Sequence, residues 1–222
     1  MLKIAPSLFA ANFLEIGREL ERLAEAGVDQ IHYDVMDGAF VPNFSFGSDM
    51  LKTVASYGIP VDVHLMIRDP DRYVDEFARA GAACITVHAE ACPHLHRTLQ
   101  HIRETGAMAG VAMNPGTAPT CLRYVADETD LALVMAVDPG CRGQKLLPHM
   151  ARKVRETRRL LDEAGSKALI EVDGGMALGS CGEFIRSGMD IMVIGRVLFS
   201  SGDMASYVRE IRAADAREAR RA

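Results

Sequence analysis

Two histidines and two aspartates stand at or next to the ends of three short apolar segments of the sequence. They are His32, Asp34, His64 and Asp173. Residues i and i+2 of a strand point to the same face, so His32 and Asp34 project together if their segment is a strand. Two imidazoles and two carboxylates suit one divalent cation, Zn²⁺ or Fe²⁺ first and Mn²⁺ or Co²⁺ as further options. The residue types therefore predict a metal site wherever the fold brings these strand ends together.

Glycine-containing turns follow three later apolar segments. The residues of interest in these turns are Gly140, Arg142, Gly143, Gln144, Gly174, Gly175, Gly195 and Arg196. Glycine lets backbone N–H groups approach an anion closely, and arginine can bind a phosphate through two parallel hydrogen bonds. We therefore predict a phosphate site at these turns, with the alternative that Arg142 points to solvent from its loop.

The elements that must position these residues repeat along the chain. Eight short apolar runs rich in β-branched residues predict strands at residues 3–5, 30–34, 61–65, 84–88, 110–113, 131–137, 168–172 and 191–194. Segments with helical spacing lie between them, such as Phe13, Ile16, Leu20 and Leu23. The average repeat is 222/8, or about 28 residues, which is typical of βα units.

Several predicted helices end with a small residue followed by glycine, which favours the left-handed conformation that reverses the chain. These glycines are Gly27, Gly81, Gly106, Gly165 and Gly188. Eight such units predict one (β/α)8 barrel, a TIM barrel, over residues 1–222, with a charged, solvated helical end from about residue 212. A doubly wound sheet is the alternative, but no G-x-G-x-x-G motif follows the first strand.

Active sites of such barrels lie at the carboxyl ends of the strands, where both predicted sites fall.

The composition excludes some classes of partner and location. With 25 Lys+Arg against 30 Asp+Glu, the chain has no extended positive field for nucleic acid. The longest uncharged stretch, residues 105–122, contains two prolines and predicts no membrane helix. Five scattered cysteines indicate free thiols in a reducing cytoplasm.

Ordered motifs along residues 2–212 or so resemble those of the ribulose-phosphate 3-epimerase family. They are IAPS at 4–7, HYDVMDG at 32–38, VPN at 41–43, DVHLM at 62–66, NP at 114–115, PG at 139–140, GQ at 143–144 and EVDGG at 171–175. The resemblance implies a (β/α)8 barrel that inverts C3 to interconvert D-ribulose 5-phosphate and D-xylulose 5-phosphate with one divalent metal ion.

The resemblance also implies roles for single residues. His32, Asp34, His64 and Asp173 match metal ligands, and Asp34 and Asp173 double as the acid and base. Five residues match substrate-binding residues of the family: Ser7, His64, Met36, Met66 and Met135. Without the resemblance, the three methionines would be predicted only to fill the barrel core. The phosphate would contact the backbone of Gly143, Gly174, Gly175 and Gly195. Such barrels often form homo-oligomers.

The chain departs from the family pattern in the phosphate loops, at Asp138, Cys141, Arg142 and Arg196, and in the first loop, at residues 10–12. Another ketose phosphate therefore stays open as the substrate, such as D-allulose 6-phosphate or a shorter or branched sugar phosphate. A related decarboxylase is disfavoured because His64 and Ile67 replace the lysine and second aspartate of its Asp-x-Lys-x-x-Asp array. A non-catalytic barrel is disfavoured because all four candidate ligands are present.

Overall fold

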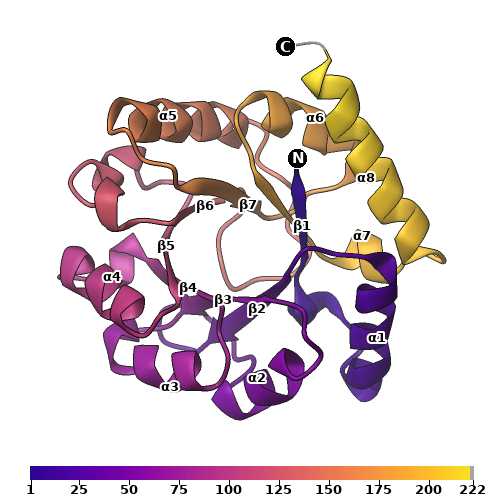
Figure 1. Ribbon diagram of the computed structural model, residues 1–222, viewed down its shortest axis with the longest axis horizontal. Coiled ribbons are helices and arrows are strands. Elements are labelled where there is room, and N and C mark those ends of the chain that lie inside the picture. The colour runs from indigo at the N-terminus through magenta and orange to yellow at the C-terminus, as the bar shows by residue number, and fades with distance from the viewer. Residues whose placement is uncertain (221–222) are drawn as a thin grey trace.

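The computed structural model describes residues 1–220 and has eight parallel strands arranged as a barrel (Figure 1). They are β1 (Lys3–Pro6), β2 (Ile31–Met36), β3 (Val61–Met66), β4 (Cys84–His88), β5 (Met108–Met113), β6 (Leu131–Met135), β7 (Leu169–Asp173) and β8 (Ile191–Ile194). The strand order β1-β8-β7-β6-β5-β4-β3-β2 brings β1 and β2 to the two edges. A parallel bridge between Ser7 and His32 joins those edges, so the ring is nearly closed.

The helices surround this ring (Figure 1). They are α1 (Ile16–Ala26), α2 (Ser48–Ala55), α3 (Val74–Arg79), α4 (Leu95–Glu104), α5 (Met150–Glu163), α6 (Leu178–Arg186), α7 (Arg196–Phe199) and α8 (Met204–Ala219). Short 3-10 helices occupy the connections: η1 (Leu8–Ala10), η2 (Phe13–Glu15), η3 (Pro70–Arg72), η4 (Ala89–Ala91), η5 (Pro119–Leu122) and η6 (Ala126–Glu128). Between β5 and β6 the described connection contains η5 and η6 in place of the α-helix that a regular βα repeat predicts.

The predicted helix-ending glycines all have positive φ. The values for Gly27, Gly81, Gly106, Gly165 and Gly188 lie between 68° and 106°. Each of these glycines precedes a strand that the sequence pattern predicted, and the strand bounds differ from the predicted ones by at most two residues. The prediction of an eight-stranded TIM barrel is confirmed, with 3-10 helices in place of the α-helix in the unit between β5 and β6.

Strand alternation divides the apolar side chains between two cores. Residues such as Val63, Ile85 and Val172 face the helices and belong to the larger core. Inside the barrel, β5, β6 and β8 contribute apolar side chains, among them Leu133 and Val193. The buried polar side chains of the interior lie on β2, β3, β4 and β7. The candidate site is built from them.

Two expectations need correction. Phe13 lies in η2 before the helix begins at Ile16 and is 46% exposed, because its ring packs against Phe46 with centroids 5.1 Å apart rather than into the helix-facing core. The charged C-terminal segment is part of α8, which begins at Met204, and it is docked rather than merely solvated. Its Asp215 accepts a hydrogen bond from Leu2 N at 2.9 Å, and its Arg212 donates to Gly27 O at 2.9 Å.

The last two residues of the predicted charged end, 221–222, lie outside the described residues. Among residues 1–220, no helix is both long and apolar enough to span a membrane.

Candidate metal centre and phosphate site

The register between β2 and β3 places the candidate metal ligands side by side. Asp34 pairs with His64, and His32 pairs with Asp62. His32 Nε2 lies 3.3 Å from His64 Nδ1 and 3.4 Å from Asp34 Oδ1. With Asp173 from β7, the four side chains each offer one ligand atom within 4.8 Å of the others. The structure therefore brings together His32, Asp34, His64 and Asp173, as the sequence predicted.

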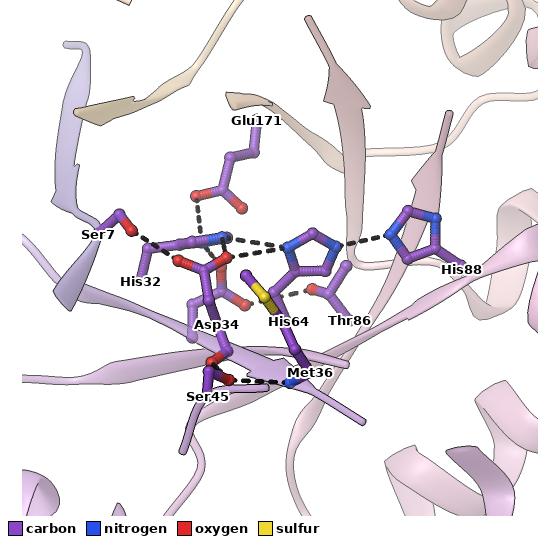
Figure 2. A network of polar contacts seen from close by, with 10 residues as sticks. Ser7, His32, Asp34, Met36, Ser45, His64, Thr86, His88 and Glu171 are labelled. Atoms are coloured by element: carbon purple, nitrogen blue, oxygen red, sulfur yellow. Dashed lines mark hydrogen bonds and ion pairs between the residues drawn. The ribbon is translucent and has the colours of Figure 1, made fainter. Parts of the chain in front are cut away.

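The second ring nitrogen of His32, Nδ1, also has polar partners. His32 Nδ1 lies 3.0 Å from Asp62 Oδ2 and 3.5 Å from Glu171 Oε1, and Thr86 donates to Asp62 Oδ1 at 3.2 Å (Figure 2). A histidine that coordinates metal through one nitrogen usually donates its other N–H to a carboxylate or carbonyl. The arrangement therefore fits His32 Nε2 as a ligand atom, with Nδ1–H donating to Asp62.

The sequence patterns did not point to Asp62 or Glu171 as parts of this site, and they placed His88 only as a strand-end residue that could line the cavity, which it does not. Asp62 and Glu171 stand two residues before His64 and Asp173, so strand alternation places them on the same face, one layer deeper. His88 ends β4 and is fully buried, with its Nε2 2.8 Å from His64 Nε2. The i−2 spacing is the signal that could have found the two carboxylates.

The site has more carboxyl groups than imidazoles. Burial lowers the pKa of His32, but Asp34, Asp62 and Glu171 outweigh it and hold that pKa above its usual value. Burial raises the pKa of Asp34, yet His32 and His64 bring it below its usual range. Burial also lowers the pKa of His64, to about 4. Buried carboxylates in excess of cationic partners are costly, and a bound cation would compensate their charge.

The two carboxyl groups of β7, Asp173 and Glu171, have raised pKa values, in contrast to Asp34. Burial, with the Asp34 and Asp62 charges added to it, raises the pKa of Asp173 to about 6 although His32 opposes the shift. Burial and the nearby Asp62 raise the pKa of Glu171 well above its usual value. The donor set, its spacing and this charge imbalance fit a divalent cation.

A cavity of about 400 Å³ opens above the cluster. Asp34 and Asp173 form part of its wall, together with Ser7, Met36, Met66 and Met135. Ser7 Oγ donates to Asp34 Oδ2 at 2.6 Å. Of the predicted substrate contacts, only His64 is absent from the lining, because its side chain lies fully buried beneath the floor.

All eight residues predicted to bind phosphate line the same cavity: Gly140, Arg142, Gly143, Gln144, Gly174, Gly175, Gly195 and Arg196. A Cβ on Gly174 would lie 2.8 Å from Val137 N, and one on Gly175 would lie 2.7 Å from Leu146 N. Both glycines also have positive φ, 123° and 67°. The turns after β6 and β7 therefore approach one another backbone to backbone at the wall of the cavity.

The polar side chains of the loop after β6 are partly engaged within the protein. The Arg142 guanidinium donates to Phe9 O and lies over the Phe9 ring, with Cζ 3.8 Å from the ring centroid. Gln144 donates its amide hydrogens to Asp138 O and Cys141 O, so it shapes its own loop. Arg196 is exposed, with Nη2 near the backbone of Gly143.

The fold and the site define a TIM barrel of the ribulose-phosphate-binding type, with a His/Asp cluster beneath a cavity at the mouth. A sequence model described as "Ribulose-phosphate 3 epimerase family" matches residues 3–199. The chain belongs to the ribulose-phosphate 3-epimerase family.

Curated relatives agree with this assignment. A protein named ribulose-phosphate 3-epimerase from Bacillus subtilis (strain 168) is 45% identical over 214 residues, which are 96% of this chain and 99% of the relative. One of the same name from Escherichia coli (strain K12) is 44% identical over 211 residues, 94% of each chain. Among solved structures, 3-hexulose-6-phosphate synthase from Salmonella typhimurium has the same fold, with a TM-score of 0.73 at 20% identity over 98% of this chain and 100% of that chain.

Proposed function

We propose that this protein is a ribulose-phosphate 3-epimerase, which interconverts D-ribulose 5-phosphate and D-xylulose 5-phosphate by inverting C3. The observation that carries the proposal is the cluster of two imidazoles and two carboxylates at the floor of the mouth cavity. Relatives that bear this name align with this chain over 94% or more of its length. The decarboxylase alternative lacks its lysine, because His64 occupies that place and is buried among the candidate ligands.

Inversion at C3 needs two groups that exchange protons. The C3 proton is acidic because it lies next to the C2 ketone, so its removal gives a 2,3-enediolate. One carboxylate must take the proton from one face, and another must return a proton to the opposite face. Asp34 on β2 and Asp173 on β7 are separated along the ring by β1 and β8. We assign them this pair of roles, each acting as the base in one direction of the reversible reaction.

His32, Asp34, His64 and Asp173 would hold one divalent cation. When bound, it supplies positive charge that stabilises the enediolate, a Lewis-acid effect. The donor set suits Zn²⁺ or Fe²⁺, and Mn²⁺ or Co²⁺ as well. Metal analysis of the purified protein, followed by reconstitution of the metal-free form with each ion, would identify the native metal.

We assign binding of the sugar to Ser7 and to the three methionines of the wall, whose flexible thioethers pack well against the mixed surface of a carbohydrate. His64 contributes through the cation, since its side chain does not reach the cavity. The phosphate would meet backbone N–H groups of Gly143, Gly174, Gly175 and Gly195 at the far end of the cavity. Arg142 and Arg196 lie close enough to this end to add positive charge.

Proton exchange tests this function directly. The protein, with its metal content confirmed, is incubated with D-ribulose 5-phosphate in D2O, and deuterium at C3 is measured by NMR together with the xylulose 5-phosphate formed. Deuterium at C3 and both epimers at equilibrium are expected. Absence of both, in protein that contains metal, would overturn the pentulose assignment.

Chain length is tested separately, because C2 and C3 are common to all ketose phosphates. We expect D-ribulose 5-phosphate to have the highest kcat/KM in a panel of ketose phosphates with four to six carbons that includes D-allulose 6-phosphate. A higher value for another member would assign the enzyme to that sugar.

We further propose that the protein works in the cytoplasm as a homo-oligomer. All five cysteines are free thiols, as is usual in a reducing compartment. Leu14 is 95% exposed and Phe44 is 75% exposed, and contact with a second copy would remove such side chains from water. Light scattering coupled to size-exclusion chromatography measures the mass, and a mass of one chain at micromolar concentration would contradict the assembly.

A further inference from the structure

A chain of side chains leads from the candidate metal centre into the protein, away from the cavity. His64 Nε2 lies 2.8 Å from Nε2 of His88, at the end of β4 (Figure 2). His88 Nδ1 in turn lies 3.1 Å from Oε2 of Glu90, in η4. Both histidines are fully buried. The proposed reaction uses neither His88 nor Glu90.

The proton positions along this chain follow from the ligand role of His64. Its Nδ1 faces His32 and Asp34, so Nδ1 must be free of a proton to bind a cation. The neutral ring then carries its proton on Nε2 and donates it to His88 Nε2. His88 must accept at Nε2, so it carries its own proton on Nδ1 and donates to Glu90. With Nδ1 of His64 free of a proton, both hydrogen bonds run in one direction: His64 donates to His88, and His88 donates to Glu90.

Glu90 is fixed at the far end. Its Oε1 accepts hydrogen bonds from Asn114 N, at 2.8 Å, and from the hydroxyl of Thr117, while Oε2 faces His88. Burial raises the pKa of Glu90, but these three donors outweigh it and lower that pKa to about 2. A carboxylate can accept hydrogen bonds at both oxygens. Glu90 can therefore accept from the loop after β5 through Oε1 and from His88 through Oε2 at the same time.

We propose that Glu90, acting through His88, fixes the tautomer and the ring orientation of His64 so that Nδ1 is free to bind the cation. Glu90 and His88 are thus positioning residues of the metal centre. The inference rests on the proposed function, because it takes His64 as a metal ligand. It extends the set of functional residues to β4 and to η4, the 3-10 helix that follows it.

The variant Glu90→Gln tests this chain with little change of shape. An amide has one acceptor oxygen, and the loop offers two donors to it, so the oxygen is expected to face Asn114 and Thr117. The NH2 group then points at His88 Nδ1, which must accept, and the proton of His88 moves to Nε2. That proton meets His64 Nε2, which favours a proton on His64 Nδ1. The ligand atom is then blocked.

The experiment measures Zn²⁺ affinity of the metal-free protein by competition with a chelating dye, for the wild type, Glu90→Gln and Thr117→Val. Thr117→Val is the matched control, because it removes one donor to Glu90 Oε1 and leaves Oε2 unchanged. We expect Glu90→Gln to weaken Zn²⁺ binding by about 10- to 100-fold, the usual effect of losing such a partner, and Thr117→Val to retain nearly all the affinity. Thermal unfolding of the metal-free proteins shows whether both variants fold.

Two further measurements separate positioning from a general structural role. In the Zn²⁺-loaded wild type, ¹⁵N NMR of the histidine side chains should report His88 as the Nδ1–H tautomer. His88→Gln, whose amide oxygen can accept from His64, should retain more Zn²⁺ affinity than His88→Phe, which cannot accept.

The outcomes separate this inference from the proposed function. A wild type that binds no divalent cation would overturn the metal centre and this inference together. A wild type that binds Zn²⁺ while Glu90→Gln binds it equally well would overturn this inference alone. An equal loss in Thr117→Val would also overturn it, because the effect would then come from the loop.

Discussion

Ser7 Oγ, just after β1, donates a 2.6 Å hydrogen bond to Asp34 Oδ2, on β2. The other oxygen of the same carboxylate, Oδ1, lies 3.4 Å from His32 Nε2 and 3.5 Å from His64 Nδ1. The two oxygens of Asp34 thus have different partners. One is placed to bind a cation, and the other is oriented by a hydroxyl on the wall of the cavity.

Ser7→Ala is expected to lower kcat/KM without unfolding the protein, because Asp34 Oδ2 loses the donor that orients it. A hydrogen bond to a charged group contributes about 1.5–3 kcal/mol. If that contribution is realised in the transition state, kcat/KM falls by about 10- to 150-fold. Steady-state kinetics with D-ribulose 5-phosphate measures the effect, and Ser7→Thr, which retains a hydroxyl, is the control. Equal kcat/KM values for Ser7→Ala and the wild type would show that Ser7 does not contribute to the reaction.

Asp34→Asn and Asp173→Asn should each reduce epimerisation by about 10²–10⁴-fold, because each removes one of the two groups that exchange protons. The rate of C3 deuterium incorporation and the metal content are measured on the same samples, since both residues are also candidate ligands. Wild-type turnover by either variant would refute the two-carboxylate scheme.

Removing the metal should abolish activity and lower the melting temperature. A ligand that binds only the folded state stabilises it by about 2.7 kcal/mol when its free concentration is 100 times Kd. Dialysis against a chelator followed by activity assays and calorimetry measures both losses, and addition of a divalent cation should restore both. Full activity in protein shown to be metal-free would contradict the assigned ligand role of the His/Asp cluster.

Arg142→Ala is expected to raise KM for the sugar phosphate by about tenfold and to leave kcat nearly unchanged. The guanidinium lies over Phe9 and can add charge at the phosphate end of the cavity, and it donates to Phe9 O rather than to Asp34 or Asp173, the proposed acid and base. A cation above an aromatic ring contributes about 0.5–2 kcal/mol to holding that geometry. Arg196→Ser is measured beside it as the second arginine of this region. Unchanged KM in both variants would show that neither arginine binds the phosphate.

Gly110→Ala tests the packing that supports the metal centre from inside the barrel. A Cβ at Gly110, on β5, would lie 2.1 Å from Thr86 Oγ1 and 3.0 Å from Thr86 Cα, so the clash includes backbone. Overpacking of this kind typically costs about 1–3 kcal/mol, and it should also disturb the hydrogen bond from Thr86 to Asp62.

Urea unfolding measures the free-energy change for Gly110→Ala. The matched control is Gly179→Ala in α6, where a Cβ has no atom within 4 Å and alanine favours the helix. The control should be neutral or stabilising, and an equally stable Gly110→Ala would contradict the packing argument.

The amino-acid sequence by itself determined the features that depend on neighbours along the chain. The period of about 28 residues, the apolar strand runs and the helix-ending glycines at Gly27 and Gly188 are local patterns. They follow from backbone sterics and from burial of alternate side chains, so they could be predicted without a fold. The place of His32, Asp34, His64 and Asp173 at strand ends is local in the same way.

Only the tertiary structure decided which side chains meet across strands. The contacts of Asp62 with His32, and of His88 with His64, depend on strand register and on the closed ring, which bring together residues distant in sequence. Arg142 reaches Phe9, 133 positions away along the chain, and α8 docks through Asp215 on Leu2. Such contacts lie outside any sequence window, because their energies come from packing and desolvation that exist only once the barrel has formed.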